Sequence, residues 1–400
     1  MDVIYTDFEK AYEKIDHLKL LEKCKSMGIE GKIGKWLQKF LENRTQQVLI
    51  EGTKSEISNV VSGSVQGSVL GPVLFLIYIT DISKEVKSDI KLFVDDAKLK
   101  IEVKTEENIE ELQNDLEKLY EWQTENKMKF NGTKFQALRY GPNEEIKNNT
   151  LYFTQNMEEI IPRMSSVRDL GVIMSDTGTF EEHIQKVSKV VRQKIGWILR
   201  TFYCRRTEFL KHLWKTLVQV HIDYCSQLYM PSQGHDMMSI EKLCYDFTTK
   251  IPGVRDENYW TRLKLLQLYS QERRMERYRI IYVWKIIEKI VPNPGIEVAT
   301  DSENNRLGRR CKIPQLKSNG RQAIKTLREN SFLIHGVKLF NCIPNEIRNI
   351  KNNQDKFKLN LDKFLSGLPD HPKIGSLVPA ALDQVTVKHS NSILAWSHEL

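Results

Sequence analysis

The sequence has few cysteines and no long apolar run, and each absence argues against a class of protein. Six cysteines are scattered over 400 residues without a Cys-x-x-Cys pair, which argues against a zinc knuckle or a disulfide framework. The longest apolar stretch, residues 69–79, is interrupted by Gly71 and Pro72. It is shorter than the about 20 residues of a membrane-spanning helix. The residues after Met1 do not have the shape of a signal peptide. We therefore expect reduced thiols and no membrane partner.

The composition and the charge distribution predict a folded chain with a basic second half. Hydrophobic residues make up 40% of the chain, which is enough for a sizeable core and too much for wholesale disorder. Residues 1–175 carry 24 basic and 29 acidic side chains, whereas residues 176–400 carry 36 and 23. A basic second half favours a polyanion such as nucleic acid as its partner, although helices rich in Lys and Arg are as often plain solvated surface.

Hydrophobic periodicity predicts an α+β fold over residues 1–175 and a helical region after it. A Gly/Ser loop at 62–68 precedes an apolar helix at 69–82. The other predicted strands are 3–6, 48–50 with 57–61, 90–94 with 97–103, 135–139, 150–153 and 171–174; the other predicted helices are 17–27, 33–41, 106–128, 180–202, 206–230, 237–250, 258–291, 321–329 and 353–366. We predict three parts: an α+β domain at 1–175, a basic helical region at 176–292, and a C-terminal region of unknown role at 293–400.

Three aspartates stand where the predicted strands would bring them to one edge of a sheet. Asp7 ends the first strand, and Asp95 and Asp96 lie at the turn of the hairpin over 90–103. Carboxylates placed in this way can hold two divalent cations that activate an attacking oxygen and stabilise a leaving pyrophosphate. Magnesium suits such a site because it prefers few carboxylates, several waters and phosphate oxygens. An Asp-Asp pair alone is common in surface turns, but apolar strands on both sides of this pair favour the metal site.

Five short segments form a distinctive series along the chain. They are 7–12 followed by Asp16 and His17, then 62–72, 93–96, Trp122 with 128–134, and 169–172. In this order and spacing they resemble the catalytic motifs and the primer-grip hairpin of reverse transcriptases from non-LTR retrotransposons, of the LINE-type, jockey-like group. The resemblance covers about residues 1–290. It implies a right-hand polymerase palm with an antiparallel sheet at 1–175, followed by an all-α thumb-like region.

The resemblance implies an RNA-directed DNA polymerase, which adds dNTPs to the 3′-hydroxyl of a DNA primer along an RNA template. Asp7, Asp95 and Asp96 would be its catalytic carboxylates and metal ligands. Asp7 and Asp95 would bridge two Mg²⁺ ions, for which Mn²⁺ is a substitute, and Asp96 would support the site. Lys134 matches a basic residue near the triphosphate and is a candidate acid for the departure of pyrophosphate. Taken alone, Lys134 is more typical of a solvated surface lysine.

Four residues match the substrate site of the family. Tyr12 matches the aromatic residue that excludes a ribose 2′-hydroxyl, because a ring under the sugar leaves no room for the extra oxygen. Gln66 and Gly67 would line the nascent base pair, and glycine allows a close approach of the backbone. Phe8, within the first motif, joins them in the predicted substrate site. Taken alone, Tyr12 is more typical of a core aromatic residue.

The predicted contacts with primer and template lie downstream. The hairpin at 167–174, with Leu170 and Gly171, would grip the primer strand. The basic helices at 180–215 would follow phosphates without reading bases, and their predicted nucleic-acid-binding residues are Lys186, Lys189, Arg192, Lys194, Arg200, Arg205 and Arg206. Three tryptophans on predicted helices are typical of core residues: Trp214, Trp260 and Trp284. Four arginines are compatible with a salt-bridged helix as well as with a nucleic-acid contact: Arg273, Arg274, Arg277 and Arg279.

The sequence departs from the family before the first motif. The family has a fingers region there, and this chain begins six residues before Asp7, so we expect the fingers to be largely missing and an apolar surface to be uncovered. A second hypothesis is therefore a catalytically silent, nucleic-acid-binding remnant of such an element. A metal-dependent nuclease would explain the carboxylates but neither Tyr12 nor the loop at 62–68. The nucleus is expected as the location only because the family's DNA target lies there.

Overall fold

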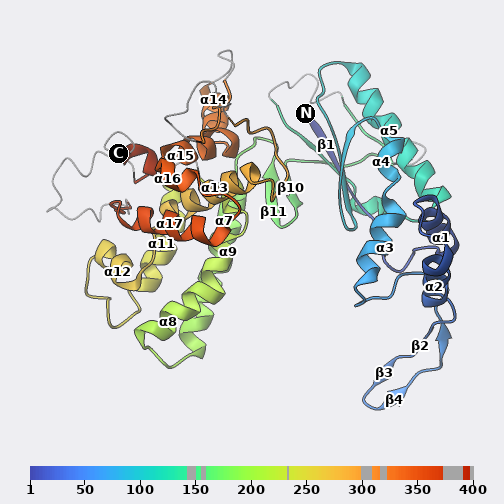
Figure 1. The fold of residues 1–400 in the computed structure, drawn as a ribbon, viewed down its shortest axis with the longest axis horizontal. Coiled ribbons are helices and arrows are strands. Elements are labelled where there is room, and N and C mark those ends of the chain that lie inside the picture. The colour runs from blue at the N-terminus through green and yellow to red at the C-terminus, as the bar shows by residue number, and fades with distance from the viewer. Residues whose placement is uncertain are drawn as a thin grey trace. The chain divides into compact units, whose positions relative to one another are not determined.

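The computed structural model describes residues 1–141, 150–154, 159–231, 234–298, 309–315, 322–372 and 391–396. It divides into two compact units, Met1–Asp169 with Met174–Gly178, and Leu170–Ile173 with Thr179–Leu400 (Figure 1). Helices and mainly antiparallel strands agree with the predicted α+β class. The second unit includes almost all of the predicted helical region and the described part of the C-terminal region.

The first unit is built on a five-stranded sheet with the order β6-β7-β1-β8-β9. The strands are β1 (Asp2–Asp7), β6 (Asp89–Phe93), β7 (Asp96–Ile101), β8 (Gln136–Arg139) and β9 (Arg163–Met164). All neighbours are antiparallel except β8 and β9, which are parallel. Because β1 lies in the middle, Val3 and Ile4 are buried, as a short apolar run in a covered strand should be.

Five helices share one hydrophobic core with this sheet. They are α1 (His17–Ser26), α2 (Gly31–Leu41), α3 (Leu70–Ile79), α4 (Ile82–Glu85) and α5 (Glu106–Glu125). Ile4 of β1, Leu99 of β7 and Leu116 of α5 belong to the same buried cluster. The start of α1 is determined locally, because the Asp16 carboxylate accepts a hydrogen bond from the Lys19 backbone N–H at 3.0 Å.

The structure differs from the predicted elements of this unit in three places. The predicted helix at 69–82 ends at Ile79 as α3, and a separate short helix, α4, begins at Ile82. The predicted strand at 150–153 is reduced to a bridge between Phe153 and Ile160. The predicted hairpin at 48–61 is a series of two-residue strands, β2 (Thr45–Gln46) with β5 (Ser58–Asn59) and β3 (Leu49–Ile50) with β4 (Thr53–Lys54). These strands are exposed, and a two-stranded ladder with no covered face gains little stability from packing.

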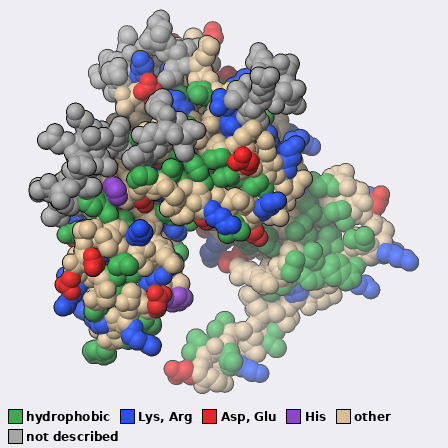
Figure 2. Space-filling model, turned by 60° about the vertical axis from the view of Figure 1, so that its left-hand side comes forward, with side chains coloured by type: hydrophobic (Ala, Val, Ile, Leu, Met, Phe, Trp, Pro, Cys, Tyr) green, Lys and Arg blue, Asp and Glu red, His purple; other side chains and the backbone are tan. Residues whose placement is uncertain are grey.

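Apolar side chains are exposed on this unit, as expected from the sequence. Val69, Val73 and Leu76 are exposed along α3, and Leu49 and Ile50 are exposed on the β3–β4 hairpin. Figure 2 shows hydrophobic side chains gathered on the surface of this unit. Since Leu74, Phe75 and Tyr78 of α3 are buried, this helix has apolar residues on its covered and its exposed side.

The second unit is helical and has two hydrophobic clusters that one helix connects. Its helices are α7 (Glu181–Thr201), α8 (Thr207–Leu213), η3 (Trp214–Val218), α9 (Gln219–Asp223), α10 (Ser226–Tyr229), α11 (Gly234–Thr248), α12 (Tyr259–Leu266), α13 (Gln271–Ile287), α14 (Gln322–Glu329), η4 (Phe332–Gly336), α15 (Val337–Cys342), α16 (Asn345–Arg348), α17 (Gln354–Ser366) and η5 (Ile393–Trp396). Met275 of α13 lies in the first cluster, and Trp284 of α13 lies in the second with Phe340 and Phe357. Residues before and after position 292 therefore share a core.

Two long helices predicted for this unit are interrupted. The helix predicted at 206–230 becomes α8 to α10 with a π-helical turn, and Cys225 has a left-handed backbone, φ 56°. The helix predicted at 258–291 ends at Gln267, φ 52°, and restarts after Ser270, whose hydroxyl accepts from the Arg273 backbone N–H at 3.2 Å. In the part of the chain that the structure describes, no helix has the length and apolarity to cross a membrane.

Candidate active site

The three predicted aspartates lie on neighbouring strand ends and their turn at one end of the sheet of the first unit. Asp7 is the residue directly opposite Asp96 in the β1–β7 pair, and Asp96 is also opposite Phe93 across the β6–β7 hairpin. The Phe8 backbone N–H donates to the Asp95 carbonyl oxygen at 3.1 Å, which ties the end of β1 to the turn. Asp7 therefore ends β1, Asp95 lies in the β6–β7 turn, and Asp96 begins β7.

The turn that carries Asp95 has an unusual backbone. Val94 has a φ of 56°, in the left-handed region that a β-branched residue rarely adopts. Such a conformation costs on the order of 1–3 kcal/mol and persists only where surrounding contacts enforce it. Phe93 and Asp96, which flank the turn of Val94 and Asp95, pair with each other and close the hairpin. Asp96, which the sequence placed at the tip, is instead the first residue of β7.

The carboxylates influence one another electrostatically. Burial raises the pKa of Asp96, and the nearby charges of Asp95 and Asp7 raise it further because they disfavour a third negative charge. Asp169 adds to this effect and is itself paired with Lys98, whose ammonium lies 2.5 Å from its carboxylate. The negative charges at the site therefore repel one another, and a bound cation would reduce this repulsion.

Lys134 reaches this site through a contact with Asp7. Its ammonium donates to Oδ2 of Asp7 at 2.6 Å, with the lysine side chain 61% exposed and the aspartate 15% exposed. The hydrogen bond to Asp7 raises the pKa of Lys134, so that the ammonium stays protonated. A short 3-10 turn, η1 (Gly132–Lys134), positions it, and the Asn131 backbone N–H donates to the Asp7 carbonyl oxygen at 2.8 Å.

The donor set suits magnesium in its chemistry. Two or three carboxylates that leave room for water and phosphate oxygens are the ligands that magnesium prefers. In the described ranges of the chain, no three His, Cys, Asp or Glu side chains converge as a ready metal site. Since Lys134 holds one oxygen of Asp7, a metal ion that binds Asp7 would compete with this ammonium.

The predicted substrate loop is joined to the first motif by hydrogen bonds. The Ser64 backbone N–H donates to the Tyr12 carbonyl oxygen at 2.9 Å, and the Gly63 N–H donates to that of Ile15 at 2.8 Å. Nε2 of His17 lies 2.8 Å from the Gly63 carbonyl oxygen. A Cβ on Gly63 would come within 2.9 Å of the carbonyl oxygens of residues 12 and 13, at a φ of 87°. Only glycine allows this close approach of the two loops.

The predicted substrate residues differ in their surroundings. The Tyr12 ring is half-buried and stacks on Phe75, with 4.8 Å between ring centroids. Gln66 and Gly67 are exposed, and a Cβ on Gly67 would meet no atom within 4 Å. The prediction that Phe8 binds substrate needs correction, because its side chain is 2% exposed and stacks on Phe130 at 4.4 Å. Phe8 packs the end of β1 into the core and does not face a substrate.

The predicted primer grip is a tight hairpin of β10 (Ser166–Asp169) and β11 (Val172–Ser175). Its two turn residues both have left-handed backbones, Leu170 with φ 46° and Gly171 with φ 89°, as a type I′ turn requires. The Tyr224 hydroxyl donates to the Leu170 carbonyl oxygen at 2.7 Å, and its ring lies 3.3 Å from where a Cβ on Gly171 would be. The turn is thus held by Tyr224, a contact that the sequence did not indicate.

The predicted basic residues of the second unit fall into two groups. Lys186, Lys189, Arg192, Lys194, Arg200 and Arg206 have exposed side chains. Arg205 has a structural contact instead, because its guanidinium donates to the carbonyl oxygens of Phe202 and, at 2.6 Å, Leu199 at the end of α7. The arginines of α13 form the salt-bridged alternative: Arg274 pairs with Asp223 and Arg277 with Asp362, while Arg273 and Arg279 are buried.

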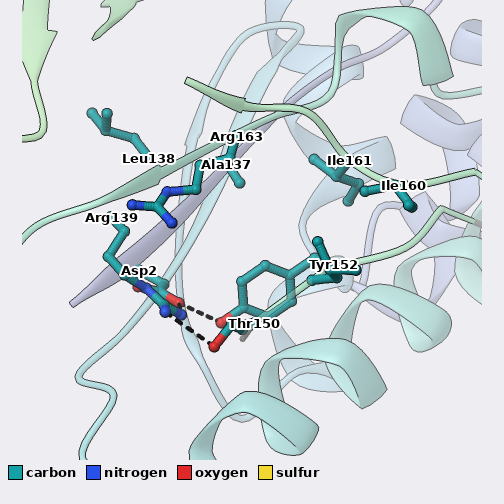
Figure 3. Close-up of a pocket in the computed structure, with 10 residues that line it drawn as sticks. Asp2, Ala137, Leu138, Arg139, Thr150, Tyr152, Ile160, Ile161 and Arg163 are labelled. Atoms are coloured by element: carbon teal, nitrogen blue, oxygen red, sulfur yellow. Dashed lines mark hydrogen bonds and ion pairs between the residues drawn. The ribbon is translucent and has the colours of Figure 1, made fainter. Parts of the chain in front are cut away.

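A small cavity lies at the other end of β1 from the carboxylates (Figure 3). It has a volume of about 120 Å³ and is lined by Asp2, Arg139, Tyr152 and neighbouring residues. The Arg139 guanidinium pairs with the Asp2 carboxylate, and the Tyr152 hydroxyl donates to the same carboxylate at 2.5 Å. The charges of Asp2 and Arg139 neutralise each other. The cavity is therefore a structural feature at the start of β1 and does not belong to the candidate active site.

The family comparison agrees with this geometry. Residues 3–174 match the family model of the reverse transcriptase (RNA-dependent DNA polymerase). This part of the chain contains β1, the 62–68 loop, the β6–β7 hairpin and Lys134, and the match supports RNA-directed DNA polymerase activity in general terms. Reverse transcriptases as a family use divalent metals, a nucleic-acid template with its primer, and dNTPs. No curated protein matches the chain.

Proposed function

We propose that the reverse transcriptase domain of residues 3–174 is the palm of an RNA-directed DNA polymerase from a mobile element of the non-LTR, jockey-like type. The observation that carries the proposal is the direct opposition of Asp7 and Asp96 across β1 and β7, with Asp95 in the adjoining turn. A polymerase needs carboxylates close together where the primer 3′-hydroxyl meets the triphosphate of the dNTP. The region after residue 176 serves as the thumb, and nuclear action on chromosomal DNA is part of the same proposal.

The proposed reaction is the transfer of a nucleotide to a primer. The primer 3′-hydroxyl loses its proton to water, its oxygen forms a bond to the α-phosphorus of a dNTP, the bond from that phosphorus to the bridging oxygen breaks, and pyrophosphate leaves. Asp7, Asp95 and Asp96 would hold two Mg²⁺ ions, which when bound activate the hydroxyl and stabilise the charge on pyrophosphate. Lys134, whose ammonium lies 2.6 Å from Oδ2 of Asp7, is the candidate acid that would protonate the leaving pyrophosphate.

Selection of the nucleotide is assigned to Tyr12, Gln66 and Gly67. The stacking of Tyr12 on Phe75 at 4.8 Å restrains the ring, and a restrained ring can exclude a 2′-hydroxyl by its bulk. The open space around Gly67 lets a base pair approach the backbone of the loop. The hydrogen bonds between the loop and residues 12–15 couple the two parts of this substrate site.

A second candidate is a silent nucleic-acid-binding remnant. The contact of Lys134 with Asp7 and the lack of three converged ligands in the described residues favour it. In this alternative the basic second unit still binds nucleic acid, but the carboxylates catalyse nothing. The two candidates therefore differ in extension and agree in binding.

Primer extension by the purified chain tests the proposal. The assay contains an RNA template annealed to a DNA primer, dNTPs and magnesium. Asp7→Asn and Asp95→Asn should each reduce extension by about two orders of magnitude or more. Asp89→Asn is the matched control, because Asp89 is exposed at the far end of the same hairpin and pairs with Lys91 and Lys100. Binding without extension would support the silent remnant, and extension that survives both substitutions would refute the assignment of the carboxylates.

A further inference from the structure

The exposed face of α7 carries positive charge together with an aromatic ring. Lys186, Lys189, Gln193, Trp197 and Arg200 follow one another at spacings of three or four residues, so they lie on one side of the helix. All five side chains are exposed, and Trp197 is 44% exposed. We call these five residues the α7 stripe. The opposite side, with Ile184, Val191 and Ile198, is buried in the first hydrophobic cluster of the second unit.

The charge of the α7 stripe is not neutralised by nearby acids. No Asp or Glu occurs between Glu182 and Glu208, and within the described residues no ion pair involves the cations of the stripe. From Lys186 to Arg200 the helix rises by about 21 Å. One strand of a duplex has a phosphate about every 3.4 Å along its axis, so this length corresponds to a segment of a few nucleotides. The stripe thus offers unpaired cations over a length that suits a short segment of polyanion.

Aromatic rings accompany these cations where α7 ends. The Lys194 ammonium lies 5.9 Å from the Trp197 ring centroid, and Phe202 packs edge-on against Trp197 with centroids 5.7 Å apart. The next residue, Tyr203, is 92% exposed. The loop that presents Tyr203 is braced, because Arg205 donates to the carbonyl oxygens of Leu199 and Phe202. An almost fully exposed ring in a braced loop is placed to contact a ligand.

A glycine in α7 lies close to a charged and an aromatic residue of the stripe. Gly196 lies one residue before Trp197, and glycine inside a helix is destabilising. A Cβ at this position would lie 3.3 Å from Nη1 of Arg200. The Arg200 guanidinium therefore lies against the helix at Gly196, next to Trp197, so that charge and ring are presented together.

We infer that the α7 stripe and Tyr203 form a binding platform for an unpaired nucleic-acid strand. Lys186, Lys189 and Arg200 contact its phosphates, and bases stack on Trp197 and Tyr203. Exposed rings favour an unpaired strand over a duplex, because stacking needs base faces that a duplex has already covered. The inference rests on the proposed function in taking nucleic acid as the ligand, and it adds the kind of strand and the residues that hold it.

Binding of the full chain in EDTA, without dNTPs, tests the platform. The probes are a fluorescein-labelled oligodeoxythymidine strand and a blunt DNA duplex of the same length. The double substitution Trp197→Ala with Tyr203→Ala should weaken strand binding by about 10- to 100-fold and change duplex binding by less than about twofold. Trp197→Phe with Tyr203→Phe should restore most of the strand affinity. Trp36→Ala in α2 is the matched control, since Trp36 is 53% exposed in the first unit.

Replacing the three cations gives a second, different readout. Lys186→Ala, Lys189→Ala and Arg200→Ala together should reduce the slope of log affinity against log salt by about 2, whereas the aromatic pair should leave that slope unchanged. Unaltered strand binding by the aromatic double variant, or equal losses for strand and duplex, would overturn the platform. A chain that binds the strand in this way but fails to extend a primer would contradict only the proposed function. Circular dichroism should be unchanged, because the substituted side chains are exposed.

Discussion

The Lys134 ammonium lies 2.6 Å from Oδ2 of Asp7, so that a proposed acid and a proposed metal ligand neutralise each other. The two residues are far apart in sequence and meet because the backbone N–H of Asn131 donates to the Asp7 carbonyl oxygen. In this arrangement the ammonium is a competitor of the metal ion for Asp7. When a triphosphate enters, its oxygens offer Lys134 an alternative partner, which would release Asp7.

Lys134→Ala should therefore have opposite effects on metal binding and on catalysis. An ion pair this exposed is worth at most about 1 kcal/mol, so Mn²⁺ binding, followed by electron paramagnetic resonance, should tighten by up to about fivefold. Primer extension should slow by about 100-fold or more, as expected for loss of a general acid. Lys134→Arg keeps the charge and is the control for metal binding. Metal affinity that falls in Lys134→Ala would contradict competition for Asp7.

Tyr12→Ala should relax the choice of sugar. Removing the ring opens the space beside Phe75, so incorporation of ribonucleotides relative to deoxyribonucleotides should rise by about tenfold or more. The measurement is single-nucleotide primer extension with each triphosphate. Loss of the stacked pair should cost about 1 kcal/mol of stability, which Tyr12→Phe should largely recover along with the discrimination. An unchanged ratio in Tyr12→Ala would leave Tyr12 as a packing residue only.

Gly63→Ala and Gly67→Ala should separate the structure of the substrate loop from its function. Both glycines have left-handed backbones, so each alanine costs about 1–2 kcal/mol. At Gly63 the new Cβ also meets two carbonyl oxygens at 2.9 Å, whereas at Gly67 it meets open space. Urea unfolding should show a distinctly larger loss for Gly63→Ala, while Gly67→Ala should mainly raise the KM for dNTP. Equal losses of stability would contradict the close packing of the loop on residues 12 and 13.

The sequence predicted the parts of the site that depend on local pattern. The positions of Asp7 at the end of a buried strand and of Asp95 at a hairpin turn follow from the pattern, whereas the pairing of Asp7 with Asp96 does not. The same pattern could not reveal that Phe8 is covered by Phe130, because that contact joins segments that are far apart in the sequence. Nor could it show that Arg205 caps α7, since a capping arginine and a solvated one have the same sequence.

The C-terminal region was the least predictable because its contacts are not periodic. Residues beyond 367 show no hydrophobic pattern, yet the Ile393 backbone N–H donates to Glu276 at 2.9 Å and the Ser392 hydroxyl contacts the same carboxylate. Glu276 is buried in α13, as is Arg273, which donates to the carbonyl oxygens of Pro369 and Asn391. Polar groups in the interior thus position a segment that apolar spacing could not place.

Burial of Glu241 gives the second unit a pH-dependent stability. Burial raises the pKa of Glu241 from 4.5 to about 8, even though it accepts hydrogen bonds from the Tyr259 hydroxyl at 2.5 Å and the Gln271 backbone N–H at 2.7 Å. A folded-state pKa above the unfolded one means that the group's contribution is fully present below about pH 4.5 and is lost as the pH rises through about 8. Burial has the same effect on the pKa of Glu276, so the midpoint temperature of the second unit should fall between pH 6.5 and 8.5.

Glu241→Gln should remove the part of this slope that belongs to Glu241. Glutamine can keep both contacts, because its oxygen can accept from Gln271 and its amide group can donate to the hydroxyl of Tyr259. The variant should therefore gain stability relative to the parent as the pH rises, by up to about 1.4 kcal/mol per pH unit. Burial lowers the pKa of His183 to about 4, so the contribution of His183 is constant above pH 6.5 and does not add to the slope in this window. Glu257→Gln, at an exposed position, is the control and should leave the pH profile unchanged. A difference between variant and parent that does not grow with pH would show that Glu241 is ionised in the folded chain.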